Sequence, residues 1–297
     1  MTPWIGTAAV LVTAVAPLHA TGDMGADSPV AFPAQGALPS RFPPDRPSRE
    51  GYVSEPEYYI FGTPERSLEQ ISAIRAQMPR GRFAPPKPDW RRLRRTRAKL
   101  TGGGELRILA LGDSIVNDTM RSAWVAKLAE AYPRATIKAI VYVRGGGGCR
   151  HYREERRIER YVAPQMPDLV LIGGISQGGT DAIPDVLKQL RAALPEVEVL
   201  LFTGAFGRAD PRVASELAAA PHSGTGAYGV ALKKLADEEQ CAYLDMTAPW
   251  AEYIRSSGVH PHLFYRDVVH ANEFGEQILA LILEAFFGVK DKQEPRR

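Results

Sequence analysis

The chain has 297 residues, of which 44% are hydrophobic and 24% are charged. This composition excludes an intrinsically disordered protein, and the length allows one sizeable core with a tail, or at most two small domains. The formal net charge of +3 is too small to indicate a nucleic-acid partner.

The N-terminal segment resembles a targeting signal. Residues 1–20 are apolar and small, contain no acidic residue, and end in Leu18-His19-Ala20, which approximates a small-x-small cleavage site. We interpret them as a secretory signal peptide or a short N-terminal anchor, which predicts a secreted or periplasmic protein. Because no Lys or Arg precedes the apolar run, a disordered N-terminus is the alternative. No later segment reaches the ~18 consecutive apolar residues of a membrane span, so no stable membrane insertion is expected after cleavage.

Two segments separate this signal from the main domain. Residues 21–50 are rich in Pro, Gly, Ala and Ser, which predicts a flexible linker. Residues 51–100 are predicted to form an arm and a basic connector, because an aromatic stretch and a run with helical spacing indicate a segment that folds back onto the main domain. The basic run from Trp90 to Lys99 indicates either adhesion to an anionic polymer or, as we prefer, a solvated helix.

From Glu105 onward, strands alternate with helices. Continuous apolar runs predict strands at LRILALG, ATIKAIVYV, DLVLI, VEVLLFTG and CAYLDM. Helical spacing predicts helices over residues 118–131, 153–163, 181–194, 226–240 and 272–287. This alternation predicts an α/β fold, a three-layer α/β/α sandwich around a five-stranded parallel sheet. We assign residues 101–288 to this domain and residues 289–297 to a charged tail.

Two short motifs combine residue types needed for nucleophilic catalysis. Leu111-Gly112-Asp113-Ser114 ends the first predicted strand, where the glycine permits a sharp turn and the serine can point into a cleft. Alone, this motif also suits an ordinary turn or a helix N-cap. A nucleophilic serine needs a base and an orienting acid, and Asp267 and His270 before the last helix supply both on one turn. Alone, that pair also suits a helix-capping loop.

Together, the two motifs resemble the first and last sequence blocks of the SGNH (GDSL-type) hydrolase family over residues 105–287. The resemblance implies a flavodoxin-like sheet with strand order 2-1-3-4-5. It also implies a serine esterase with Ser114, Asp267 and His270 as catalytic triad, and with no metal or cofactor. In that topology Cys149 and Cys241 lie at opposite edges of the sheet, so two free thiols are predicted.

The same resemblance implies an oxyanion hole. In the family, the donors include the N–H of a glycine after the second strand and an Asn side chain after the third. Gly148, the last of four consecutive glycines, matches the first position, and Gln177 matches the second, with the N–H of Ser114 as a further donor. The family Asn itself is missing, and Ser176 is the other candidate for its place.

A second candidate nucleophile lies in the same region. Residues 174–178 read Gly-Ile-Ser-Gln-Gly, which matches the nucleophile elbow of α/β-hydrolases between a buried strand and a helix. Only two predicted strands precede the strand that leads to Ser176, no HGGG-type motif stands upstream, and the tight Asp-x-x-His pair is natural to SGNH hydrolases. We therefore favour Ser114, and either interpretation predicts an esterase.

The expected substrate is a small-molecule or polysaccharide ester, and predicted secretion favours an O-acetylated polysaccharide. One alternative is an O-acyltransferase that uses the same triad on a glycan. The other is a non-catalytic glycan-binding protein on the same scaffold, for which the missing Asn is the only hint. The aromatic residues 51–61 either stack on sugars or, as we prefer, are buried against the main domain.

Overall fold

The computed structural model describes residues 59–61, 66–144, 146–174, 179–207, 209–222, 224–267 and 269–289. The predicted signal segment, the linker, and all but the first residue of the predicted charged tail lie outside these ranges. Within them, no helix combines the length and apolar character that crossing a membrane requires.

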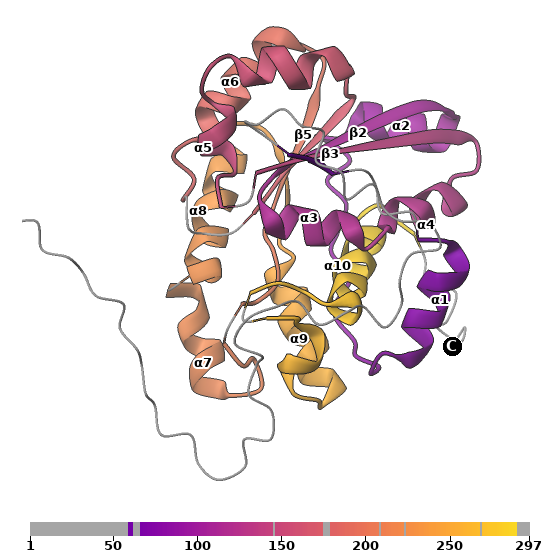
Figure 1. Cartoon of the computed structure of the whole chain (residues 1–297), viewed down its shortest axis with the longest axis vertical. Helices are drawn as coiled ribbons and strands as arrows, with labels where there is room; N and C mark the ends of the chain where they lie inside the picture. Colours follow the sequence, from indigo (N-terminus) through magenta and orange to yellow (C-terminus); the bar gives the residue numbers. More distant parts are fainter. Residues whose placement is uncertain are drawn as a thin grey trace, which may run out of the picture.

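A central sheet carries helices on both faces (Figure 1). Its five parallel strands are β2 (Gly104–Gly112), β3 (Ala135–Val143), β4 (Leu169–Ile172), β5 (Glu198–Phe202) and β6 (Ala242–Leu244). They lie side by side in the order β3-β2-β4-β5-β6, which confirms the three-layer fold and the strand order 2-1-3-4-5.

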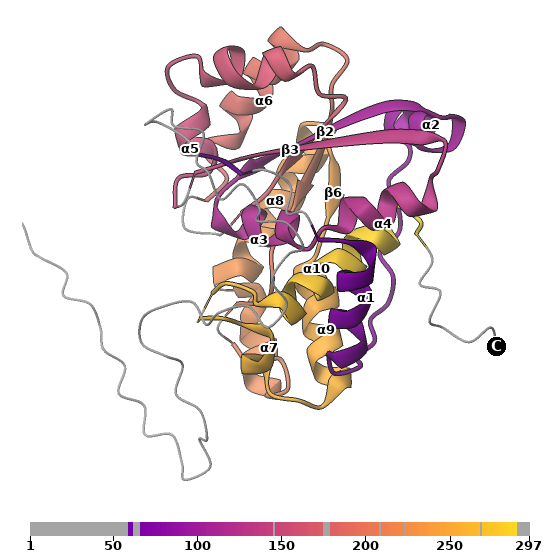
Figure 2. The ribbon, with the colours of Figure 1, turned by 45° about the vertical axis from the view of Figure 1, so that its right-hand side comes forward.

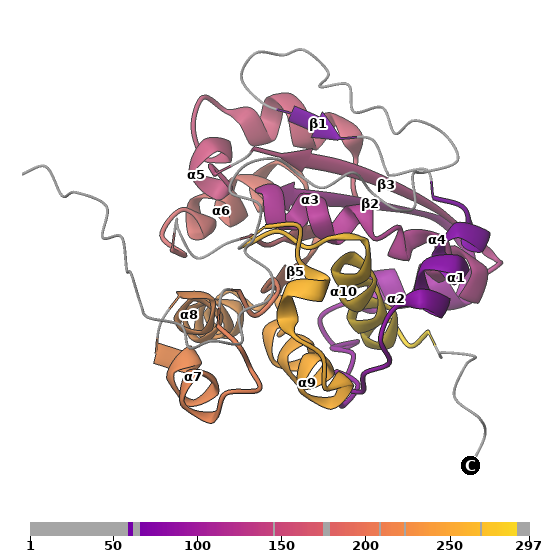
Figure 3. The same ribbon diagram turned by 60° about the horizontal axis from the view of Figure 1, so that its bottom comes forward.

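A sixth strand extends the sheet beyond the predicted domain. β1 (Tyr59–Phe61) lies beside β3 (Figure 3). The two strands pair antiparallel, with Tyr59 opposite Val143. Part of the predicted aromatic arm is therefore an edge strand, which the sequence did not predict.

Each face of the sheet buries its own core, because successive strand residues point to opposite sides. In β2, Leu106, Ile108 and Ala110 face one core, whereas Leu109 and Leu111 face the other. The first core is completed by α1 (Leu68–Gln77), α2 (Arg94–Gly102), α3 (Ser114–Arg121), α4 (Trp124–Ala131), α9 (Thr247–Ser257) and α10 (Glu273–Phe286). The second is completed by α5 (Cys149–Tyr152), a π-helical turn η1 (Ile158–Val162), α6 (Ile183–Ala193) and α8 (Gly224–Glu238). Short connecting helices are η2 (Ala163–Gln165), α7 (Ala214–Ala219), η4 (Ala220–His222) and η5 (Pro261–Phe264).

Two of the predicted helices are interrupted. The helix predicted over residues 118–131 breaks at Ala123, whose φ of 55° separates α3 from α4. The prediction of a single helix over residues 153–163 is wrong, because Glu155 and Arg156 have left-handed φ values of 51° and 55°. Left-handed backbone cannot continue a right-handed helix, so only short turns form on either side.

The basic run before the domain forms helix α2, which is docked rather than fully solvated. Thr96 and Leu100 are buried in its inner face. The Glu198 carboxylate accepts hydrogen bonds from the N–H groups of Arg95 and Thr96 at 2.7 and 2.8 Å, which caps the helix. Two charges of the run also pair with acidic residues of the same chain, Arg95 with Glu196 and Lys99 with Asp168. These contacts favour a structural role over adhesion to a polymer.

Helix α1 lies along α10 (Figure 2). Ile71 and Ile74 of α1 are fully buried, and the Arg75 guanidinium pairs with the Glu284 carboxylate of α10 at 2.6 Å.

The cysteines Cys149 and Cys241 are both free thiols, as predicted.

Candidate active site

Ser114 is the first residue of α3, directly beyond the carboxyl end of β2. The Asp113 carboxylate caps this helix by accepting a hydrogen bond from the Ile115 N–H at 2.9 Å. Gly112 is required for close packing rather than for a sharp turn. A Cβ atom there would lie 2.4 Å from Val116 Cγ2 and 2.5 Å from the carbonyl oxygen of Gly173.

The structure brings the three predicted triad residues into one hydrogen-bonded chain. His270 Nε2 lies 2.9 Å from Ser114 Oγ, and His270 Nδ1 lies 2.8 Å from Asp267 Oδ2. Asp267 Oδ1 accepts hydrogen bonds from the N–H groups of Val269 and His270, both at 2.8 Å. The serine and the histidine are 156 positions apart in the sequence, so the fold alone creates this contact.

The environment of Asp267 determines which nitrogen of His270 carries the proton. Burial alone would raise the pKa of Asp267, but the hydrogen bonds from the His270 and Val269 N–H groups and from the imidazole hold it below its ordinary value. The carboxylate is therefore ionised at neutral pH and can only accept, so Nδ1 of His270 must donate to it. Nε2 then carries the lone pair that faces the Ser114 hydroxyl, which is the arrangement of a general base.

The predicted oxyanion donors have different surroundings. Within the described ranges, no acceptor is found for the N–H of Ser114, which stands at the start of α3. The N–H of Gly148 points back to the carbonyl oxygen of Arg144 at 3.4 Å. Gln177 and its alternative Ser176, which is also the second candidate nucleophile, lie outside the described residues.

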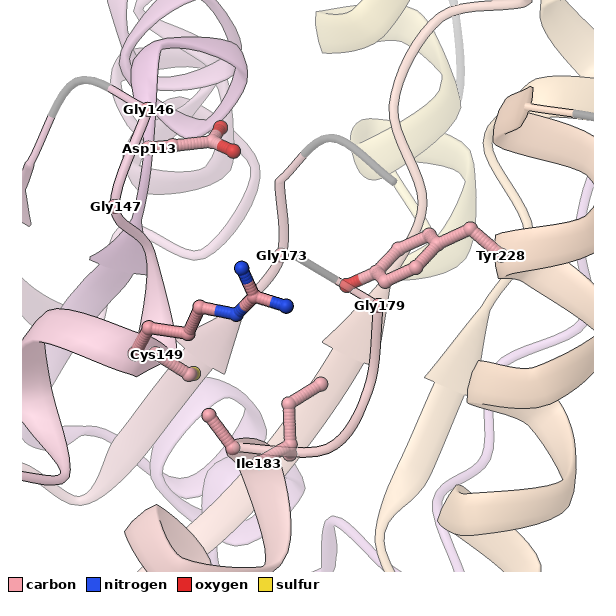
Figure 4. A pocket seen from close by; sticks show the side chains of 10 residues that line it. Asp113, Gly146, Gly147, Cys149, Gly173, Gly179, Ile183 and Tyr228 are labelled. Atoms are coloured by element: carbon pink, nitrogen blue, oxygen red, sulfur yellow. The ribbon is translucent and has the colours of Figure 1, made fainter. Parts of the chain in front are cut away.

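A small cavity of about 30 Å³ lies beside Asp113, between the loops that follow β3 and β4 (Figure 4). This volume suits one or two water molecules. Gly146 and Gly147 line it rather than Gly148, and the hydroxyl of Tyr228 is directed into it. Cys149 also lines the cavity, but burial and the nearby charge of Asp113 raise the pKa of its thiol to about 12. This thiol is protonated at neutral pH and is a poor nucleophile.

His151 packs on the glycine loop and makes the stability of the protein pH-dependent. Burial, with the positive charges of Arg157 and Arg144, lowers the pKa of His151 to about 4. The folded protein therefore does not bind the proton that the unfolded chain binds below about pH 6.5. The contribution of neutral His151 to the free energy of unfolding is complete above that pH and is lost as the pH falls toward 4. The loss is at most about 1.4 kcal/mol per pH unit, and less because the ring is only partly buried.

We expect His151→Phe, which keeps a ring but cannot titrate, to lose less stability than the parent chain between about pH 7 and pH 5. Denaturant unfolding of both chains at the two pH values measures this difference. Equal losses in the two chains would contradict the assignment.

Two charged residues beside the triad were not predicted. Asp118 and Arg266 form an ion pair at 2.6 Å, and both contact the segment that carries His270.

In the described part of the chain, no group of three or more His, Cys, Asp or Glu side chains is arranged to hold a metal ion.

Comparison with known proteins identifies the fold. Neither a protein-family model nor a curated protein sequence matches the chain. A solved structure described as a GDSL-like lipase from Parabacteroides merdae ATCC 43184 superposes with a TM-score of 0.51 at 16% identity, covering 63% of this chain and 98% of that one. A two-domain esterase active on acetylated mannans, co-crystallised with mannopentaose, superposes with a TM-score of 0.54 at 16% identity. That match covers 71% of this chain and 56% of the esterase, so the chain spans about half the length of that relative.

At these identities the similarity shows the fold alone, and that fold is the SGNH, or GDSL-type, hydrolase fold. The prediction made from the first and last sequence blocks is confirmed at this level.

Proposed function

We propose that the protein is a serine hydrolase that cleaves carboxylic esters with Ser114, His270 and Asp267 as its catalytic triad. The observation that carries this proposal is the unbroken chain of hydrogen bonds from Ser114 Oγ through the imidazole to the Asp267 carboxylate. The structurally similar esterase active on acetylated mannans and the predicted signal segment 1–20 support a polysaccharide outside the cytoplasm as substrate, with an acetyl ester as the bond cleaved.

In the proposed reaction, His270 Nε2 takes the proton of the Ser114 hydroxyl while Oγ forms a bond to the ester carbonyl carbon. The imidazolium, stabilised by Asp267, then returns this proton to the leaving alcohol as the C–O ester bond breaks. Water then gives a proton to the same imidazole and attacks the acyl carbon. The imidazolium returns this proton to Ser114 Oγ as the bond between Oγ and the acyl carbon breaks, which releases the carboxylic acid and restores the free serine.

The negative charge on the carbonyl oxygen needs hydrogen-bond donors. The N–H of Ser114 is well placed, because it stands at the positive end of α3. Gly148 can join it if its long hydrogen bond to Arg144 is exchanged for the oxyanion, and the amide of Gln177 is the third proposed donor. Each donor of this kind typically contributes about 3 kcal/mol to transition-state stabilisation.

Labelling with a fluorophosphonate probe tests the proposal. We expect the parent chain and Ser176→Ala to be labelled and Ser114→Ala to remain unlabelled, because Ser114 Oγ lies 2.9 Å from the imidazole nitrogen that can act as its base. Labelling lost in Ser176→Ala and kept in Ser114→Ala would instead identify the elbow serine as the nucleophile. A parent chain that never reacts would favour the glycan-binding alternative.

The substrate is tested separately with acetylated mannan. Release of free acetate by the parent chain and not by Ser114→Ala supports a polysaccharide deacetylase. If acetate appears only on an added sugar acceptor, the protein is an acyltransferase that uses the same triad.

A further inference from the structure

Asp118 connects the helix of the nucleophile to the segment of the base. It lies on α3, one turn after Ser114, and is only 1% exposed. Its Oδ1 accepts a hydrogen bond from Arg266 Nη2 at 2.6 Å, and its Oδ2 accepts one from the Ala271 N–H at 3.0 Å. Arg266 directly precedes Asp267 and Ala271 directly follows His270. One carboxylate therefore holds both ends of the segment that contributes the proposed acid and base.

Arg266 closes this segment on itself. Its backbone N–H donates to the carbonyl oxygen of His270 at 3.0 Å, and its Nη1 donates to the carbonyl oxygen of Ala271. Next to it, Tyr265 forms an isolated antiparallel bridge with Ala271. The two ends of the loop from Arg266 to Ala271 therefore lie side by side, and Asp118 binds both of them.

The anchoring contacts belong to a buried cluster of charges. Glu276, on the first turn of α10, is 2% exposed and lies beneath the same loop. Its carboxylate is 3.2 Å from Arg121, 3.6 Å from Arg66 and 3.8 Å from Arg266. Burial raises the pKa of Asp118, and the Arg266 guanidinium opposes this shift. Buried charges with several fixed partners tolerate few arrangements, because moving one leaves another uncompensated.

We propose that Asp118 and Arg266 are positioning residues of the active site, which set the distance between His270 and Ser114 by tying the base-bearing segment to α3. This inference rests on the proposed function for its catalytic consequence and on the described contacts for its geometry. Because Ser114 and Asp118 share one helix, any shift of the loop against Asp118 becomes a shift of the imidazole against the nucleophile. A misplacement of about 1 Å is enough to cost up to about 100-fold in rate.

The first test compares Asp118→Asn with Glu284→Gln. Glu284 is a matched control, because it is also a buried carboxylate paired with an arginine at 2.6 Å, but its partner is Arg75 and it contacts no triad residue in the described structure. We expect Asp118→Asn to lower kcat and the rate of probe labelling by about 10- to 100-fold with KM nearly unchanged. Glu284→Gln should leave both rates near parental values. Parental rates in Asp118→Asn would overturn the proposal.

A second variant covers the case in which Asp118→Asn does not fold. The double variant Asp118→Leu/Arg266→Met removes both charges of the pair together. Glu276 keeps Arg121 and Arg66 as partners, and of the described groups the Ala271 N–H is the one that loses its acceptor, so the variant should stay folded. If the pair served stability alone, a folded variant without it would keep the parental activity. Parental activity in this variant would therefore overturn the proposal. We expect it to unfold cooperatively at a somewhat lower temperature than the parent and to be labelled slowly.

A spectroscopic readout separates this inference from the proposed function. The Nδ1 proton of His270, donated to Asp267, should give a low-field NMR signal that is absent from His270→Gln. We expect the signal to be weakened or lost in Asp118→Asn and kept in Glu284→Gln. If the parent does not react with the probe, the proposed function fails, yet this signal still decides whether Asp118 positions the imidazole. An unchanged signal in Asp118→Asn would refute the positioning role.

Discussion

Replacing Asp267 by asparagine is expected to lower kcat for ester hydrolysis by about 10³- to 10⁴-fold in a chain that remains folded. In the parent, Asp267 Oδ1 holds two backbone N–H groups and Oδ2 holds His270 Nδ1. If the Asn oxygen keeps the two N–H groups, its NH₂ group faces Nδ1, which must then accept a hydrogen bond. The proton moves to Nε2, and His270 can no longer accept the proton of Ser114.

The opposite orientation of the asparagine also fails. Its oxygen would then face Nδ1, but its NH₂ group would point at the two backbone N–H groups and leave them without an acceptor. Steady-state kinetics with p-nitrophenyl acetate measure the effect. Asp237→Asn is the control, because Asp237 lies in an exposed ion pair with Lys233 on α8, an element that carries none of the triad residues. An Asp267→Asn chain with near-parental kcat would show that the carboxylate does not set the tautomer of His270.

The sheet was predictable because its strands are nearly continuous apolar runs, which are typical of parallel strands buried on both faces. Several elements around it were not, β1 and α9 among them. The three residues of β1 carry no pattern of their own and form a strand only because the edge of β3 is available. Helix α9 was not predicted. Its sequence contains Pro249, which usually breaks a helix, but here the proline lies in the first turn, where its missing N–H is not needed.

The triad was predictable because its members belong to short motifs, each of which sits at a recognisable boundary between a strand or loop and a helix. Asp118 and Arg266 belong to no motif. A polar residue in a helical pattern suggests a solvent-facing position, and the partner that makes Asp118 buried is 148 positions away. Gly148 was selected by its position after the second strand, but the local turn decides where each N–H points, and it directs that of Gly148 to Arg144.

The second large effect is expected from Gly275→Ala, which should lower the free energy of unfolding by about 1–3 kcal/mol. Gly275 lies in the first turn of α10, where helix propensity alone would favour alanine by about 1 kcal/mol. An added Cβ, however, would lie 2.1 Å from the carbonyl oxygen of Phe264, 2.7 Å from the ring of Trp250 and 3.0 Å from Ala271 Cβ. Trp250 is fully buried, so neither it nor the backbone oxygen can move aside cheaply.

The same clash should reach the site, because Ala271 follows His270 and is held by Asp118. We therefore expect the folded Gly275→Ala chain to be labelled more slowly by the fluorophosphonate probe as well. Gly102→Ala is the matched control, since Gly102 ends helix α2 with no atom within 4 Å of the new methyl group. Denaturant unfolding should show a change of no more than about 1 kcal/mol for the control. A Gly275→Ala chain as stable as the parent would mean that α10 can move away from η5 at little cost. The packing of α10 against η5 would then not hold the base-bearing segment in place.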